Sequence, residues 1–217
     1  VQNMELLEDE EVRNFVGEYE PEHYLLNPKE PMAVGPYAVS NYYMESKYGQ
    51  VQAMKNAKQV AIDVMNEFAK MSGRQYGLFE EYRLDDAEYA VVLIGSAAGT
   101  AKDAIDRLRE EGRKVGLLKI RFFRPFPGEE IAKALSKVKV VGLMDRAESF
   151  SGNGGPLGAE TMAALHRAGN TAKTVEYMYG LGGRDIKVED FWHIFDELEE
   201  VANGKVVDGY SYIGLRK

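Results

Sequence analysis

The sequence predicts an α/β protein, a three-layer α/β/α sandwich around a mostly parallel sheet, preceded by a helical and extended segment. From residue 87 onward, short apolar runs alternate with amphipathic helical patterns in the order β-α-β-α-β-α-β-α-β. The runs at residues 89–94 and 115–120 are apolar at almost every position, which is typical of strands covered by helices on both sides. Alternating units of this kind build parallel sheets through right-handed crossovers.

The first 40 residues predict little regular structure. Residues 8–16 can form one short helix with acids in its first turn, where the helix dipole favours them. Four prolines follow, at Pro21, Pro28, Pro31 and Pro36. Because proline excludes a long helix or a central strand, residues 18–36 are predicted to be an extended segment that crosses a surface. We expect three aromatic side chains to hold it in place: Tyr19, Tyr24 and Tyr37.

The longest helical pattern covers residues 41–72. Its apolar residues recur at alternating steps of three and four and mark one continuous face: Met54, Ala57, Ala61, Val64, Phe68 and Met71. Val60 and Met65 widen this face, and Gly73 follows as a natural C-terminal cap. We expect the helix to pack in the core. The alternative is a helix that faces another subunit, because the face is wide and rich in adaptable methionine.

A boundary between two domains is predicted at residues 75–86, where charged residues accumulate and the helical periodicity stops. The predicted domains are residues 1–85 and residues 86–217. The second domain is predicted to contain strands at residues 89–94, 115–120, 138–144 and 174–178, an edge strand at 210–215, and helices at 101–108, 129–136, 156–165 and 188–202.

Proline and glycine set the limits of these elements. Pro125 and Pro127 lack a backbone N–H, so they end the strand at residues 115–120. Pro156 suits the first turn of a helix, whereas Gly112 and Gly204 are predicted to end two others.

The composition excludes several classes of function. The chain has 217 residues, of which 45% are hydrophobic and 29% charged, as expected of a globular protein. The net charge of −8 argues against nucleic acid and anionic membrane as partners. No cysteine is present to form a disulfide, a thiol nucleophile, or a cysteine-ligated cluster or zinc site. The histidines have no partner at metal-ligand spacing: His23, His166 and His193.

The hydropathy pattern predicts a cytoplasmic protein. The longest nearly apolar run, residues 90–98, is much shorter than the ~20 residues that a membrane-spanning helix needs. No basic and apolar leader opens the chain. Because the chain begins with Val1, we expect a fragment, a processed product or a split subunit.

Two glycine-rich stretches are candidate binding loops. Residues 95–100, GSAAGT, can cradle a phosphate at a helix N-terminus, but they match neither a P-loop nor a nucleophile elbow. Residues 152–158, GNGGPLG, suggest a dinucleotide-binding loop in which Leu157 replaces the third glycine. The alternative in each case is a purely structural connection, a tight strand-to-helix turn or a loop, and this alternative is favoured.

Charged residues follow two of the predicted strands. Asp145, Arg146 and Glu148 lie at a carboxyl end, where open α/β sheets bind ligands, although an acid beside an arginine favours a salt bridge. The sequence Gly182-Gly183-Arg184-Asp185 follows the next strand. Arg184 can bind a carboxylate, a phosphate or a partner subunit, and Asp185 can cap the last helix. No set of nucleophile, base and oxyanion donors assembles, so the chain alone is not evidently an enzyme.

Four stretches together resemble one enzyme family. They are YYMESKYGQVQAMKNA (residues 42–57), EFAKMSGRQYG (67–77), GSAAGTAKDAIDRLREEGRKVGLLKIRFFRPFP (95–127) and YMYGLGGRDI (177–186). Their sequence and order resemble the C-terminal part of the alpha subunit of pyruvate:ferredoxin oxidoreductase, or pyruvate synthase. The wider family is that of the thiamin-dependent 2-oxoacid:ferredoxin oxidoreductases.

The resemblance implies a layout and an activity. Residues 86–217 match the transketolase C-terminal-like domain of the family, and residues 1–85 match the end of its pyrimidine-binding thiamin domain with a connecting segment. The whole enzyme converts pyruvate, CoA and oxidised ferredoxin into acetyl-CoA, CO₂ and reduced ferredoxin. It uses thiamin diphosphate, Mg²⁺ and iron–sulfur clusters, and its partners are beta, gamma and ferredoxin-like delta subunits, or equivalent domains, and ferredoxin.

This chain departs from the family because its 217 residues lack the first part of the thiamin domain, with the cofactor-activating glutamate. We therefore predict no catalytic, cofactor-binding or metal-binding residue in the chain, which alone is expected to be inactive. Its expected role is scaffold and subunit contact, with candidate interface or anion contacts at Arg124, Gly182, Gly183, Arg184 and Asp185. Two alternatives stay open: another 2-oxoacid (2-oxoisovalerate, 2-oxoglutarate, an aryl oxoacid or oxalate), or a non-catalytic module that binds a nucleotide or anion.

Overall fold

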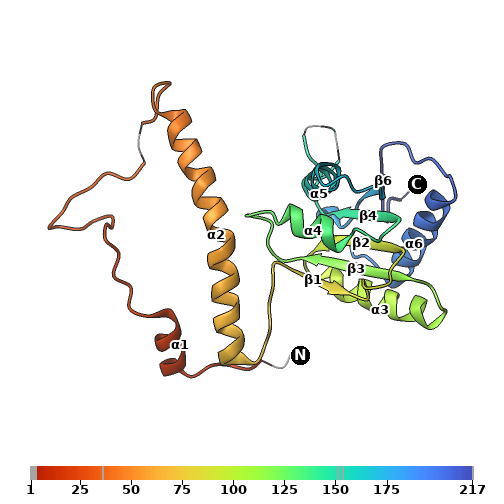
Figure 1. Ribbon diagram of the computed structural model, residues 1–217, viewed down its shortest axis with the longest axis horizontal. Helices are drawn as coiled ribbons and strands as arrows, with labels where there is room; N and C mark the ends of the chain where they lie inside the picture. Colours follow the sequence, from red (N-terminus) through yellow and green to blue (C-terminus); the bar gives the residue numbers. More distant parts are fainter. Residues whose placement is uncertain (1–3, 36, 151, 153, 217) are drawn as a thin grey trace.

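The computed structural model describes residues 4–35, 37–150, 152 and 154–216. Its centre is a six-stranded sheet in the order β1-β3-β2-β4-β5-β6 (Figure 1). The strands are β1 (Phe79–Tyr82), β2 (Tyr89–Ile94), β3 (Val115–Ile120), β4 (Val140–Asp145), β5 (Lys173–Met178) and β6 (Tyr210–Tyr212). β1 pairs with β3 in antiparallel orientation, and the other pairings are parallel. The predicted α/β fold with a mostly parallel sheet is confirmed.

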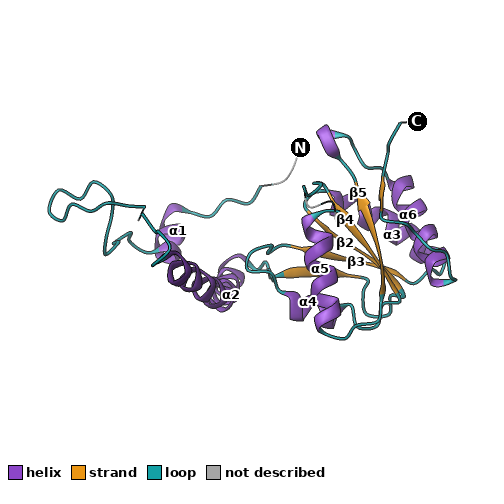
Figure 2. Ribbon diagram, turned by 90° about the horizontal axis from the view of Figure 1, so that it is seen from above, coloured by secondary structure: helices purple, strands orange, loops and turns teal. Residues whose placement is uncertain are grey.

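Helices cover both faces of the sheet (Figure 2). The helices α3 (Ala97–Glu110) and α6 (Val188–Ala202) pack over one core, and α4 (Gly128–Ala134) and α5 (Pro156–Arg167) pack over the other. The 3-10 turn η1 (Leu181–Gly183) follows β5. The three layers of the predicted sandwich are therefore helix, sheet and helix.

Strand β2 shows how an apolar run fills both cores. Val91 and Leu93 belong to the core under α3 and α6, whereas Ala90 and Val92 belong to the core under α4 and α5. All four side chains are fully buried. Successive side chains of a strand point to opposite faces, so a run without polar residues stabilises both layers at once.

The sequence analysis missed β1, which carries two glutamates and no apolar run. Glu80 on this strand accepts a hydrogen bond from Lys102 and lies 3.8 Å from both Lys119 and Arg121. The Lys102 hydrogen bond and the neighbouring cations hold the pKa of Glu80 below its ordinary value. The sheet thus begins within the stretch that was predicted to be a boundary.

The predicted first and longest helices are confirmed as α1 (Asp9–Val16) and α2 (Tyr43–Ser72), and Gly73 adopts the left-handed capping conformation. The expected core position of α2 is wrong, because none of its residues is buried in the described structure. Figure 1 shows α2 beside the sandwich, with α1 near its C-terminal end. The Phe15 and Phe68 rings pack edge to face at 5.9 Å, which joins the two helices.

The segment between α1 and α2 forms no helix or strand in its described residues, as the prolines predict. The expectation that tyrosines hold this segment in place is wrong. Tyr19 is 88% exposed and Tyr37 is 92% exposed, and Tyr24 is also exposed. The three rings belong to a segment whose described residues form no helix or strand, and each leaves 45% or more of its surface exposed to solvent. Among the described residues, no helix is both long and apolar enough to cross a membrane.

Candidate functional site

The crevice at the carboxyl ends of β2 and β4 is the candidate functional site. β2 leads into α3 on one face of the sheet and β4 leads to α5 on the other, so the chain leaves these neighbouring strands in opposite directions. Open α/β sheets bind ligands at such a switch point. The crevice has a volume of about 370 Å³, and its lining includes Ile94, Ser96, Phe123, Met144, Arg146 and Tyr179.

The predicted glycine-rich turn at residues 95–100 forms one wall of this crevice. Gly95 has a positive φ of 89°, which lets the chain turn sharply from β2 into α3. Ser96 precedes the helix and its side chain makes no capping hydrogen bond. The stretch is thus a tight strand-to-helix turn, and its first residues face the crevice.

Two buried carboxylates from the sheet occupy the N-terminus of α5. Asp145, at the end of β4, accepts hydrogen bonds from the backbone N–H groups of Leu157 at 3.1 Å and Gly158 at 2.7 Å. Glu176, in β5, accepts one from the Gly155 N–H at 2.6 Å. Burial raises the pKa of both carboxyl groups above their ordinary values, although these N–H donors oppose the shift.

The glycines of residues 152–158 make room for those carboxylates. A Cβ atom on Gly155 would lie 2.2 Å from Cγ of Asp145, and a Cβ atom on Gly158 would lie 2.2 Å from Oε1 of Glu176. The N–H groups that would hold a pyrophosphate are already bonded to the protein's own acids. The geometry therefore supports the structural loop and not the dinucleotide-binding loop; Ser151 and Asn153 lie outside the described residues.

The expected salt bridge between neighbouring acid and arginine does not form among the described residues. Asp145 turns toward α5, whereas Nε of Arg146 donates to the Gly180 carbonyl at 3.2 Å. The third charged residue, Glu148, accepts hydrogen bonds from the Tyr210 and Tyr212 hydroxyls at 2.6 and 2.7 Å. Each charge is thus bound to a different part of the carboxyl edge of the sheet.

Sequence reasoning missed Glu176 and Tyr179. Both side chains are buried, at 7% and 4% exposure, at the carboxyl end of β5. The sequence did offer a signal for Glu176, because this acid lies inside a strand between the apolar residues Val175 and Tyr177. A charge in such a position requires hydrogen-bond donors nearby.

Prediction for the buried pair: Glu176→Gln should be more stable than the wild type at pH 7. Glutamine keeps an acceptor for the Gly155 N–H and removes the buried charge. Since the pKa of Glu176 is raised from 4.5 in the folded protein, the wild type gains stability as the pH falls through the folded value toward 4.5. The advantage of the variant should therefore shrink in that range. Urea unfolding of the wild type and the variant, at pH 7 and near pH 4, measures the difference in their free energies of unfolding at each pH. A variant that is less stable than the wild type at pH 7 would contradict the prediction.

The predicted contact residues lie on separate elements. Gly182 and Gly183 have φ values of 66° and 83° in η1, as the turn requires. Arg184 follows them and donates to the Gly214 carbonyl. Asp185 was expected to cap α6, but the N-cap is Lys187, whose backbone N–H donates to the carboxylate of Asp190 in the first turn at 2.8 Å.

Arg124 lies after β3, on the far side of β2 and β4 from Arg184. Its guanidinium stacks on the Phe123 ring at 4.4 Å and donates to Glu160. Three strand spacings separate β3 from β5, about 14 Å, so the structure does not bring the two arginines together.

An apolar groove runs between α2 and the segment after β3. Its volume is about 690 Å³, and its lining includes Ala57, Val60, Ala61, Val64, Phe122 and Pro125. Val60 is 59% exposed and Val64 is 45% exposed, so much of this apolar surface faces solvent. Lys58 joins α2 to α4 beside the groove through a 2.7 Å ion pair with Glu130. We call this surface the α2 groove.

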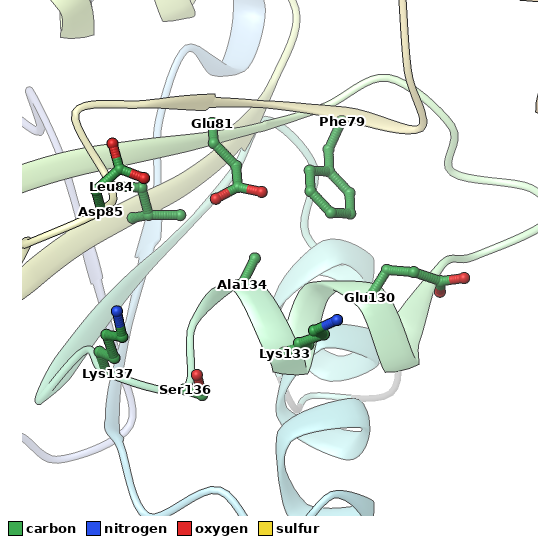
Figure 3. A pocket seen from close by; sticks show the side chains of 9 residues that line it. All are labelled: Phe79, Glu81, Leu84, Asp85, Glu130, Lys133, Ala134, Ser136 and Lys137. Atoms are coloured by element: carbon green, nitrogen blue, oxygen red, sulfur yellow. The ribbon is translucent and has the colours of Figure 1, made fainter.

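A further hollow of about 420 Å³ lies between β1 and α4 (Figure 3). Glu81 and Asp85 line its β1 side, and Lys133 and Lys137 line the α4 side. Both signs of charge are present, so the lining favours no single ligand charge.

Comparison with known proteins gives consistent matches. Residues 87–191 match the family model described as pyruvate:ferredoxin oxidoreductase core domain II. The chain is 43% identical over 218 residues to pyruvate synthase subunit PorA of Thermotoga maritima, which covers 100% of this chain and 55% of that subunit. It is 41% identical over 211 residues to NADH-dependent phenylglyoxylate dehydrogenase subunit alpha of Aromatoleum evansii, covering 94% and 51%. For PorA of Methanocaldococcus jannaschii the identity is 40% over 210 residues, covering 96% and 52%.

These matches and the α/β sandwich define the chain as part of an oxidoreductase subunit. The chain belongs to the pyruvate:ferredoxin oxidoreductase family and fits a C-terminal part of the alpha subunit. The resemblance found in the sequence motifs is therefore confirmed. The chain spans about half the length of the curated relatives that it matches.

Proposed function

We propose that the chain is part of the alpha subunit of a thiamin-diphosphate-dependent 2-oxoacid:ferredoxin oxidoreductase that acts on pyruvate. The reaction converts pyruvate, CoA and oxidised ferredoxin into acetyl-CoA, CO₂ and reduced ferredoxin. The similarity to two pyruvate synthase subunits over nearly the whole chain supports this proposal. Beta, gamma and ferredoxin-like delta subunits, or equivalent domains, are the proposed partners and hold the thiamin diphosphate, Mg²⁺ and iron–sulfur clusters.

Within that complex, we propose that this chain is scaffold and subunit contact. The observation that carries this role is α2, a helix of 30 residues with none buried in the described structure. Its apolar residues line the α2 groove together with Phe122 and Pro125. Helices in proteins gain most of their stability by packing an apolar face, so an uncovered face of this length favours a packing partner.

The division of the chain follows the same proposal. Residues 86–217 form the transketolase C-terminal-like domain, and residues 1–85 form the end of the pyrimidine-binding thiamin domain with its connection. β1 joins the two parts, because it lies ahead of residue 86 and pairs with β3 of the sheet.

A second candidate substrate is an aryl 2-oxoacid. The observation in its favour is the 41% identity to a phenylglyoxylate dehydrogenase subunit, close to the 43% for a pyruvate synthase subunit. Oxidation rates with pyruvate and with phenylglyoxylate, measured on the purified complex with CoA and ferredoxin, distinguish the two. Faster reduction of ferredoxin with phenylglyoxylate would replace pyruvate as the proposed substrate.

The test of the proposal as a whole is native mass spectrometry of the protein purified anaerobically from its source, with iron, sulfide and thiamin analysis. A large complex that holds iron, sulfide and thiamin diphosphate is the expected result. A lone species of 24.3 kDa without cofactors would overturn the proposal. Stoichiometric thiamin diphosphate binding by the isolated chain would overturn the scaffold role.

Prediction for the contact residues: Arg124→Ala and Arg184→Ala should weaken assembly more than they weaken the fold. Both side chains are exposed. Arg124 donates to the distant residue Glu160, and Arg184 donates to the carbonyl of Gly214. Exposed contacts of this kind contribute roughly 1 kcal/mol or less to stability. Arg74→Ala is the matched control for Arg124, because Arg74 also stacks on a phenylalanine, Phe68, outside the α2 groove. Titration with the other subunits and urea unfolding measure the two effects, and an unfolded variant would count against the prediction.

A further inference from the structure

Tyr179 is the residue of the crevice whose chemistry the fold does not use. Its side chain is 4% exposed and lines the cavity at the carboxyl end of β5. Within the described part of the chain, its hydroxyl forms no hydrogen bond. Other tyrosines of this edge do have partners, because Tyr177 donates to Glu197 at 2.8 Å and Tyr210 donates to Glu148. The oxygen is not one of the fully enclosed unpaired atoms of the described structure, so it reaches the open space of the cavity, where a bound acceptor can pair with it.

Two further donors lie around the same cavity. Arg146 uses Nε to bind the Gly180 carbonyl, so its two terminal nitrogens make no hydrogen bond or ion pair within the described chain. Ser96 lines the opposite side, at the N-terminus of α3, and its hydroxyl makes no capping bond. The positive end of the α3 dipole adds to the charge of Arg146. The polar groups of the cavity that are free to bind are thus donors.

Asp145 is the acid that lines the cavity, and hydrogen bonds from α5 offset part of its negative charge. Asp145 is 4% exposed and directs both oxygens to N–H groups of α5. The Asp145 carboxylate is therefore directed toward α5 and does not pair with the neighbouring Arg146. The remaining wall is apolar and includes Ile94, Phe123 and Leu157.

From these observations we propose that the crevice binds a small organic anion, a carboxylate or a phosphate ester with an apolar body. The Tyr179 hydroxyl and the Arg146 guanidinium bind the anionic group, and the apolar wall covers the rest of the ligand. This proposal goes beyond the scaffold role and does not depend on it, since the α2 groove shares none of these residues.

The test is isothermal titration calorimetry of the full chain with four probes: benzoate, phenyl phosphate, inorganic phosphate and benzyl alcohol. We expect saturable binding of benzoate or phenyl phosphate and much weaker binding of the other two, which lack the apolar body or the charge. The preferred aromatic probe identifies a carboxylate or a phosphate ester as the natural anion.

Variants then locate the binding. Tyr179→Phe removes only the hydroxyl and should weaken the binding of the preferred probe about 10-fold, as loss of a hydrogen bond to a charged group does. Arg146→Gln should weaken the binding of the same probe to a similar extent. Because Arg146 is exposed, this variant still tests the proposal if the Tyr179 variant folds poorly. Tyr177→Phe is the matched control, because it removes a hydroxyl that faces Glu197 outside the cavity, and should leave the affinity unchanged. Absence of saturable binding to the wild type, or equal binding by the wild type and the Tyr179 and Arg146 variants, would overturn the proposal.

Discussion

Gly155→Ala should lower the free energy of unfolding by roughly 3 kcal/mol or more. The new Cβ atom would lie 2.2 Å from Cγ and 2.4 Å from Oδ2 of Asp145, so the carboxylate has to move. That movement breaks its hydrogen bonds to the Leu157 and Gly158 N–H groups and leaves a buried charge without donors. Backbone strain is not the cause, because Gly155 has a φ of −95°, which alanine adopts freely. Urea unfolding at pH 7 measures the loss.

The matched control is Gly99→Ala. Gly99 lies within α3 near the same edge of the sheet, and a Cβ atom there meets no atom within 4 Å. Alanine in a helix is favoured over glycine by up to about 1 kcal/mol, so this variant should be neutral or slightly stabilised. If the two variants unfolded at the same urea concentration, the capping role of Asp145 would be refuted.

Val60→Asp should weaken assembly of the complex by roughly 3–5 kcal/mol, which is at least a 100-fold loss of affinity. Val60 is 59% exposed in the chain and lines the α2 groove, so the aspartate is hydrated before assembly. If a partner covers the groove, assembly buries that charge without a counterion. The stability of the chain itself should change little, because the site is exposed. Native mass spectrometry of the chain mixed with the other subunits measures the assembled fraction.

The control for this variant is Lys55→Asp. Lys55 is on the same helix, is exposed and does not line the groove, so its change introduces the same side chain outside the proposed contact. It should assemble nearly as well as the wild type. Equal assembly of the Val60 variant and the control would place the contact elsewhere on the chain.

The sandwich was predictable because short stretches of the sequence indicate its strands and helices without knowledge of the tertiary contacts. The runs at Tyr89–Ile94 and Val115–Ile120 are apolar at almost every position and have no polar alternation, and the structure places side chains of both in the two cores. Pro156 marks the first residue of α5, as its fixed φ favours. Where the local pattern and the tertiary environment agree, the elements lie close to their expected positions.

The errors arise where tertiary contacts decide. β1 has the sequence FEEY and is stabilised by cations from α3 and β3, which no local pattern reveals. The apolar face of α2 has the spacing of a core helix, and periodicity alone cannot tell a core from a groove at the surface. Tyr179 was overlooked because its proposed role depends on a cavity that five separate segments form together.

The two acids at the N-terminus of α5 have a mechanical consequence for the crevice. Both Asp145 and Glu176 belong to strands, so α5 is attached to the sheet at two points by its first residues. The wall that Pro156 and Leu157 contribute therefore keeps its place without a ligand. A site that is rigid before binding spends little entropy on ordering its own chain, so a small ligand can reach useful affinity from few contacts.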